Sequence, residues 1–209
     1  MYDAYWSIAP PFLVAYWVLT SPSGFIGVRA VLICLLMTVW GCRLTYNWIR
    51  HWGGLSHEDW RYVDLRKRTK QAYWGVSFIG LHCFPTAIVF VACLPVYLAL
   101  HSPSRAVNWL DALACIVVVF AITIEAKADN QLHQFVIGSK RPGETLRSGL
   151  WAYSRHPNYF GQLLLWWGFF LFGLAADLSH YASGLGALLI TLMLWFISVP
   201  MIEKRSLER

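Results

Sequence analysis

Charged residues are scarce in this sequence. Only 13% of its 209 residues are Asp, Glu, Lys or Arg, whereas 57% are apolar. Soluble globular domains carry roughly 25% charged residues, so the composition excludes an ordinary soluble domain and is typical of a membrane protein. The sequence also lacks low-complexity segments and strong internal repeats. We therefore expect a single membrane domain over residues 1–209.

Paired cysteines and a secretion signal are lacking as well. The five cysteines are odd in number, contain no CxxC spacing and lie in or beside apolar stretches. Free buried thiols are the expected state, and neither a disulfide framework nor a metal site is expected. No basic region follows Met1 and no small-residue cleavage site precedes Pro10, so no cleavable signal peptide is expected.

Six apolar stretches are present instead, at about 5–20, 28–46, 76–100, 107–126, 158–176 and 182–200. A helix needs about 20 residues to cross the hydrocarbon core of a bilayer. The last five stretches are long enough, whereas the first is short and contains Pro10 and Pro11. The predicted fold is all-α, a polytopic helical bundle with about six transmembrane helices.

The positive charges predict the orientation in the membrane. Fifteen of the 17 Lys and Arg residues lie in 43–70, 127–155 and 204–209, which leaves Arg29 and Arg105 for the other side. The positive-inside rule then places both termini and two long loops, about 47–75 and 127–157, in the cytoplasm. The net charge of +6 suits anionic lipid headgroups or a phosphorylated cofactor, and no nucleic-acid partner is expected.

The most informative stretch is Ser148–Gln162, a polar and aromatic cluster next to an apolar helix. Pro157 suits the first turn of that helix, and Arg155 and His156 stand at its entrance. A helix N-terminus flanked by cations binds anions well, which suits the phosphates of a nucleotide cofactor. The alternative is that Arg155 and His156 only anchor the helix among lipid headgroups.

A second cluster consists of Glu125, Asp129 and His133, each four residues apart. Four residues leave only ~40° of rotation around a helix, so the three side chains share a face. Carboxylates on a membrane helix point to function by default. The alternative is that Glu125 pairs with Lys127 or Arg155 and only closes the helix end.

Two further residues suggest chemistry on a carbonyl group. Tyr46 lies near the cytoplasmic end of the second stretch, close to Arg43 and Arg50. A tyrosine beside a cation can give or stabilise a proton in a carbonyl reaction, although a lone tyrosine here is more often an interfacial aromatic. Asp3 is the only acid near the first stretch.

Four segments together resemble a known family. They are Glu58–Tyr62 (EDWRY), Glu125–Gln131 (EAKADNQ), Arg155–Gly161 (RHPNYFG) and Pro200–Arg205 (PMIEKR). This ordered set is similar to the bacterial branch of the steroid 5α-reductase-like membrane proteins, and the likeness covers most of the chain. The resemblance implies a helical bundle that uses NADPH, bound from the cytoplasm, to reduce a C=C bond conjugated to a carbonyl in a lipid or steroid-like small molecule.

The resemblance also implies roles for individual residues. Asp129, Tyr153, Arg155, His156 and Asn158 would line the NADPH pocket, with Glu125 close by. Tyr46 would polarise the substrate carbonyl, with Asp3 as its acid partner. Three features depart from the family pattern: Gln162 stands where relatives commonly have an acid, and relatives carry additional sequence before the Asp3 region and after Arg205.

Two other interpretations remain. The Arg-His-Pro-x-Tyr-x-Gly run also resembles isoprenylcysteine carboxyl methyltransferases and phospholipid N-methyltransferases. In that case S-adenosylmethionine would sit at the same helix entrance, with Glu203 holding its amino group. A non-catalytic sterol-binding or scaffold protein is the third possibility. Glu125, Asp129 and the Glu58–Tyr62 segment favour the reductase.

Overall fold

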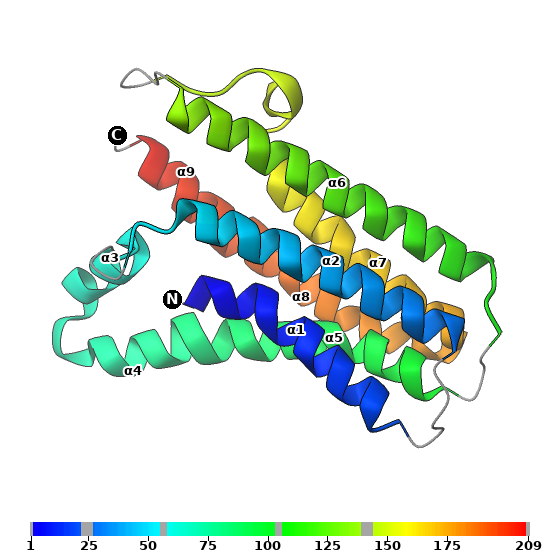
Figure 1. Cartoon of the computed structure of the whole chain (residues 1–209). Coiled ribbons are helices and arrows are strands. Elements are labelled where there is room, and N and C mark those ends of the chain that lie inside the picture. The colour runs from blue at the N-terminus through cyan, green and yellow to red at the C-terminus, as the bar shows by residue number, and fades with distance from the viewer. Residues whose placement is uncertain (1, 22–26, 55–57, 103–105, 139–143, 208–209) are drawn as a thin grey trace.

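The computed structural model describes residues 2–21, 27–54, 58–102, 106–138 and 144–207, with side chains from Tyr5 onward in the first range. Within these ranges the protein is all-helical and contains no strand. The helices form six segments that run along one another (Figure 1). Five of the segments are long and apolar enough to cross a membrane, and the sixth is the shorter apolar helix at the N-terminus. The expected all-α membrane bundle is therefore confirmed.

Two of the six segments are compound. In chain order the elements are α1 (Tyr2–Leu19), α2 (Val28–His51), α3 (Trp60–Thr69), η1 (Lys70–Ala72), α4 (Tyr73–Ser77), η2 (Phe78–Cys83), α5 (Phe84–His101), α6 (Trp109–Ile137), η3 (Gly149–Ala152), α7 (Pro157–Ala176), η4 (Leu178–Gly184), α8 (Leu185–Met193), η5 (Leu194–Ser198) and α9 (Val199–Leu207). Elements α3 to α5 follow one another without a break, as do η4 to α9. Both η2 and η5 are π-helical.

The predicted cytoplasmic loops contain more helix than the hydropathy pattern indicated. Helix α6 continues to Ile137, and α3 begins at Trp60 inside the stretch expected as the first loop. Asp59 explains the start of α3, because its side chain accepts a hydrogen bond from the Arg61 backbone N–H at 2.8 Å. Such a cap satisfies one of the free N–H groups at a helix N-terminus. Hydropathy detects the apolar part of a helix and misses a polar extension.

The core is built from large aromatic side chains and close helix contacts. Trp40, Trp166 and Phe169 are almost completely buried, and the rings of Trp40 and Trp166 lie edge to face with centroids 5.6 Å apart. Helix α7 approaches α6 at Gly161, where an added Cβ would lie 2.9 Å from the Ala121 carbonyl oxygen. Small residues let membrane helices pack at short distance, which brings the polar residues of α6 and α7 together.

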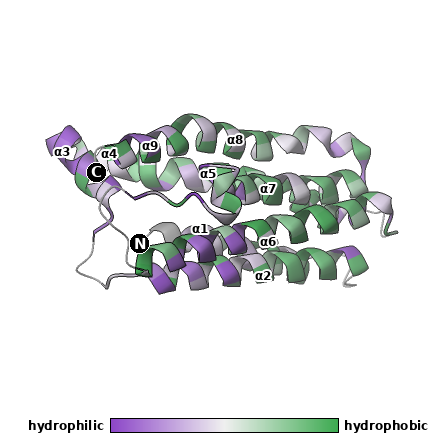
Figure 2. Cartoon of the chain, turned by 90° about the horizontal axis from the view of Figure 1, so that it is seen from above, coloured by the Kyte–Doolittle hydropathy of each residue, from purple (hydrophilic) through white to green (hydrophobic). Residues whose placement is uncertain are grey.

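The two ends of the bundle differ in polarity. Hydrophilic residues gather at the end that carries α3 and the C-terminus (Figure 2), and the N-terminus lies at the same end (Figure 1). At the opposite end Arg29 of α2 forms a buried ion pair with Asp111 of α6, with Nε and Oδ1 2.7 Å apart. The Arg29 guanidinium also donates to the carbonyls of Ala106 and Ala175. This pair ties three segments together far from the polar end.

Candidate functional site

A cavity of about 560 Å³ opens toward the polar end of the bundle. Its polar wall comes from α2, α6 and α7 and its apolar wall from η2, α5, α8, η5 and α9, with α1 and α3 completing the enclosure. The polar and aromatic lining residues are Trp6, Asn47, Trp48, His51, Arg61, Tyr62, Phe84, Glu125, Asp129, Asn158, Tyr159, Gln162 and Ser198. This volume lies within the range of about 300–1,000 Å³ that is typical of small-molecule sites.

The polar wall is organised around Arg43 of α2. Its guanidinium forms an ion pair with Glu125 and another with Asp129, in which Nη1 and Oδ2 lie 2.6 Å apart. Both carboxylates belong to α6 and are buried. Arg43 does not line the cavity, whereas both acids do. The arginine therefore lies behind the carboxylates and neutralises one of two negative charges, which explains how a membrane helix can carry both.

Amide side chains hold Asp129 from both neighbouring helices. Asn47 of α2 donates to Asp129 Oδ2 at 3.0 Å, and Asn158 of α7 donates to Oδ1 at 3.3 Å. Arg50 in turn donates to the side-chain oxygens of Asn47 and Asn130, both at 2.7 Å. The carboxylate thus has donors on both oxygens and is fixed in orientation at the cavity wall.

Gln162 is also part of this wall. It is buried one turn after Asn158 on α7. With its amide nitrogen turned toward α6, it donates to Glu125 Oε1 at 3.0 Å, and its oxygen accepts from the indole N–H groups of Trp6 at 2.8 Å and Trp166 at 3.2 Å. A second acid at this position would face Glu125 directly. The glutamine provides the donor that the buried carboxylate needs.

The entrance of α7 is a cluster of charged and aromatic groups, and it begins at Pro157 as the sequence predicted. Arg155 Nη1 and His156 Nε2 lie 3.3 and 3.5 Å from Glu203 Oε1 of α9, so this acid links α7 to α9. The His156 ring stacks on Tyr159, with centroids 5.7 Å apart. The Arg155 side chain is 84% exposed, so an anion in solution can also reach its guanidinium.

The segment before α7 is fixed to α6. The Trp151 indole N–H donates to the Ala128 carbonyl at 3.0 Å, and the Leu150 backbone N–H donates to Gln131 Oε1 at 3.0 Å. Gly149 has a positive φ of 61°, and an added Cβ there would collide with the Gln131 side chain. This local geometry sets the path of the chain from η3 into the α7 entrance.

The structure brings only part of the predicted site together. Glu125, Asp129 and Asn158 line the cavity. Glu125 pairs with Arg43, and neither Lys127 nor Arg155 is its partner. His133 lies outside the cavity lining, with Nδ1 3.1 Å from His51 Nε2.

Four other predicted residues do not line the cavity: Tyr46, Tyr153, Arg155 and His156. Arg155 and His156 stand at the α7 entrance as described, and Tyr153 is 92% exposed. Tyr46 is 62% exposed, with the Arg50 guanidinium 5.7 Å from its ring centroid. Asp3 belongs to α1, but its side chain lies outside the described part of the structure. The roles predicted for Tyr46 and Asp3 stay predictions.

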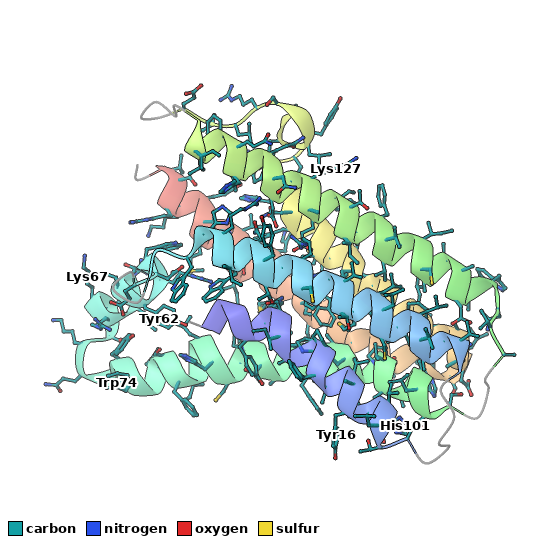
Figure 3. The ribbon with its side chains drawn as sticks, in the orientation of Figure 1. Tyr16, Tyr62, Lys67, Trp74, His101 and Lys127 are labelled. Atoms are coloured by element: carbon teal, nitrogen blue, oxygen red, sulfur yellow. The ribbon has the colours of Figure 1, made fainter. Side chains whose placement is uncertain are left out.

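Sequence reasoning missed several lining residues, among them Asn47, His51 and Tyr62. Figure 3 shows Tyr62 on the side of α3 that faces the bundle, whereas Lys67 projects on the outer side. The sequence signal that points to Tyr62 is the Glu58–Tyr62 segment.

Asp59 keeps this part of α3 in place. Its Oδ1 accepts from Arg61 Nε at 2.9 Å, and Arg61 is a cavity residue. Burial alone would raise the pKa of Asp59, but the side-chain and backbone hydrogen bonds from Arg61 outweigh it and lower that pKa below its usual value. The carboxylate is therefore charged at neutral pH and orients Arg61 at the mouth.

Metal binding finds no support in the described ranges, where no three His, Cys, Asp or Glu side chains are grouped as ligands. The cysteines of these ranges are free, but only Cys93 is buried, whereas Cys42 and Cys83 are exposed. The expectation of buried thiols is therefore wrong for Cys42 and Cys83, because both lie on outward-facing parts of their helices.

Comparison with known families covers the whole chain. Residues 1–209 match the family described as "Protein of unknown function (DUF1295)". The chain belongs to this family. A similar sequence is an uncharacterized protein of Schizosaccharomyces pombe, 30% identical in an alignment over 203 residues that covers 87% of this chain. The alignment covers 59% of the length of that curated relative. No solved structure matches. This DUF1295 member is thus an integral membrane protein by family and by its five apolar helices.

Proposed function

We propose that this protein is an NADPH-dependent membrane reductase that saturates a C=C bond conjugated to a carbonyl in a lipid or steroid-like molecule. The observation that carries the proposal is the shared cavity wall formed by Glu125, Asp129 and Asn158, which come from two helices. The resemblance to steroid 5α-reductase-like proteins assigns these same three residues to the cofactor pocket. The Glu58–Tyr62 segment of that resemblance also reaches the cavity, through Arg61 and Tyr62.

The residues present fit NADPH at this end of the bundle. The buried carboxylates and the Asn158 amide offer acceptors and donors suited to the hydroxyl and carboxamide groups of a dinucleotide. Arg155 at the entrance of α7, with Arg61 at the cavity, offers cations for its phosphates. When bound, NADPH would supply a hydride to the β-carbon of the substrate, and a proton from water would add to the α-carbon to complete the saturation.

The chain's own residues have the remaining tasks. Leu44, Leu81 and Met193 are apolar lining residues that exclude water from the reacting end of the substrate. The developing negative charge on a substrate carbonyl oxygen needs hydrogen-bond donors. Tyr62 and Arg61 line the cavity and are donors of this kind, and Tyr46 would have to reach the site by a change in α2. We further propose that the cavity and both termini face the cytoplasm, because the cations gather at this end.

A methyltransferase is the second candidate. One observation favours it: Glu203 lies beside the α7 entrance, within 3.5 Å of both Arg155 and His156. An acid there suits the amino group of S-adenosylmethionine. In this structure, however, Glu203 already has a cationic partner, and the reductase interpretation also uses α6 and α3. The third candidate is a sterol-binding or scaffold protein without catalysis.

Cofactor binding to the purified protein distinguishes the three candidates. We expect NADPH to raise the Tm of the detergent-solubilised protein and to quench its tryptophan fluorescence, with no effect of S-adenosylmethionine. Arg155→Ala should weaken NADPH binding about tenfold or more through loss of a charged hydrogen bond. Arg68→Ala is the matched control, because Arg68 pairs with Asp64 on the exposed side of α3. Stabilisation by S-adenosylmethionine alone would replace the reductase by the methyltransferase, and stabilisation by neither ligand would favour the scaffold.

A further inference from the structure

The apolar wall of the cavity contains both π-helical segments of the described chain. Gly80 and Leu81 of η2 line one side, and Ile197 and Ser198 of η5 line the other. π-Helical turns are rare and are found mostly at functional sites. Here two of them, more than a hundred residues apart in sequence, border the same cavity.

The two helical segments that carry these turns meet at one end and separate at the other. Gly186 of α8 lies directly against the Ala92 backbone of α5, where an added Cβ would collide with it. From this contact α4 and α9 diverge toward the polar end of the bundle (Figure 1). The cavity lies between the diverging parts, because it is lined by η2 and α5 on one side and by α8, η5 and α9 on the other.

The cavity reaches the molecular surface between η2 and η5. Phe84 and Ile197 line it and are nevertheless 46% and 49% exposed. Gly80 is exposed as well, and an added Cβ there would meet no atom within 4 Å. Other exposed side chains of the two segments are apolar: Phe78 and Ile79 of η2, and Trp195 and Phe196 of η5. Both segments belong to helices long enough to cross a membrane, so this opening faces lipid and not water.

The opening and the cavity have opposite chemistry. The opening is apolar on both sides, whereas the inner wall carries Glu125, Asp129 and Gln162. A ligand that fits both the apolar opening and the polar inner wall has a polar group at one end and a long apolar body at the other. A water-soluble metabolite would have to leave its polar surface against exposed phenylalanine and tryptophan side chains, which is unfavourable.

We infer that the gap between η2 and η5 is a lateral opening through which an amphipathic membrane lipid enters the cavity, with its polar end against the α6–α7 wall and its apolar body between the two π-helical segments. The inference rests on the proposed function for the reaction at the polar end, but the route itself does not depend on that reaction. Water-soluble cofactor would reach the same cavity from its other side, where His51 and Arg61 lie.

Filling the opening tests the inference. Gly80→Phe places a large side chain in free space between the two walls, and Gly75→Phe is the matched control. Gly75 lies in α4, has equally free space around it and does not line the cavity. The probe is a photoreactive enone sterol added to the purified protein in phosphatidylcholine vesicles, and labelled peptides are identified by mass spectrometry.

In the parent protein we expect labels in 78–84 and 194–201. Gly80→Phe should reduce labelling about tenfold, which corresponds to about 1.4 kcal/mol, because its ring occupies the space the lipid would use, while Gly75→Phe labels like the parent. Ile197→Trp narrows the opening from the opposite wall and should have the same effect, which covers the case that Gly80→Phe does not fold. Equal labelling of all variants, or equal loss with Gly75→Phe, overturns the lateral opening.

NADPH binding by the same preparations separates the two proposals. Gly75→Phe should bind NADPH as the parent does, because Gly75 does not line the cavity. A protein that takes up the sterol probe through the opening and does not bind NADPH would retain the inference and lose the reductase. A protein that binds NADPH and labels outside 78–84 and 194–201 would retain the reductase and lose the inference.

Discussion

Replacing Arg43 by methionine should destabilise the protein strongly. Methionine keeps most of the side-chain length, so the change removes the cation with little change in packing. In the parent, the Arg43 side chain is 16% exposed and the acids it contacts, Glu125 and Asp129, are 6% and 9% exposed. Without it, two carboxylates one helical turn apart face each other inside the bundle, and their remaining donors, among them the amides of Asn47, Asn158 and Gln162, carry no charge.

The expected loss can be stated from comparable sites. Removing one partner of a buried ion pair costs about 3–5 kcal/mol in unfolding free energy. For a chain of this size the loss corresponds to a decrease in Tm of about 6–20 °C. The upper part of the range applies here because Arg43 serves two acids.

Thermal unfolding in detergent, followed by tryptophan fluorescence, measures the loss. The double variant Arg43→Met with Glu125→Gln removes one charge of each sign and leaves a single carboxylate with two amide donors. We expect it to recover more than half of the lost Tm. An Arg43→Met protein as stable as the parent, or a double variant no better than the single one, would show that this ion-pair arrangement does not exist in the folded protein.

The remaining predictions concern other parts of the bundle. Gly161→Ala should lower the free energy of unfolding by about 1–3 kcal/mol, because its Cβ would lie 2.9 Å from the backbone of α6. Gly75→Ala lies on an open helix surface and should be neutral or stabilising. Comparing the Tm of each variant with that of the parent checks both predictions. Asp111→Asn breaks the buried pair at the other end and should lower Tm while the NADPH dissociation constant stays unchanged, so a parallel loss of affinity would contradict a purely structural role. Asp59→Ala should remove the α3 cap and lower the free energy of unfolding by about 1 kcal/mol. Because the folded-state pKa of Asp59 is lowered, its contribution to stability is present above the unfolded pKa near 3.8 and is lost as pH falls through the folded-state pKa. The curves of Tm against pH for the parent and for Asp59→Ala should therefore converge in acid.

The spacing of residues was sufficient to predict the parts of the site that lie on one helix. Glu125 and Asp129 share a face because a helix turns ~100° per residue, and the structure places both on the cavity wall. Pro157 likewise marks the first turn of α7. The membrane spans could also be predicted, because that prediction needs only the length and apolarity of each segment.

The rotation of α2 could not be predicted in this way. Tyr46 and Asn47 differ by ~100° around the helix axis, and the structure directs Asn47 to the cavity and leaves Tyr46 exposed. In a membrane helix the face toward lipid is as apolar as the face toward the core, so periodicity does not distinguish them. Partners far apart in sequence, such as Arg43 and Glu125, also depend on that rotation.

The π-helical turns were equally invisible to the sequence. A single extra residue in a turn changes the direction of all following side chains, and apolar stretches such as 78–83 and 194–198 contain no residue that marks it. Gln162 shows a third kind of limit. Its departure from the family pattern was visible, but its contacts with Glu125, Trp6 and Trp166 require three other segments to be in place.

Isotope transfer tests the reductase most directly. The purified protein is incubated with NADPH that carries deuterium at the transferable position of its nicotinamide, together with an enone sterol in phosphatidylcholine vesicles, and the lipids are analysed by mass spectrometry. The reductase predicts a saturated product with one deuterium at the β-carbon, greatly reduced in Asn158→Ala and unchanged in Arg68→Ala. Full NADPH occupancy without deuterium in any lipid product, or equal transfer by Asn158→Ala, would contradict hydride transfer in this cavity.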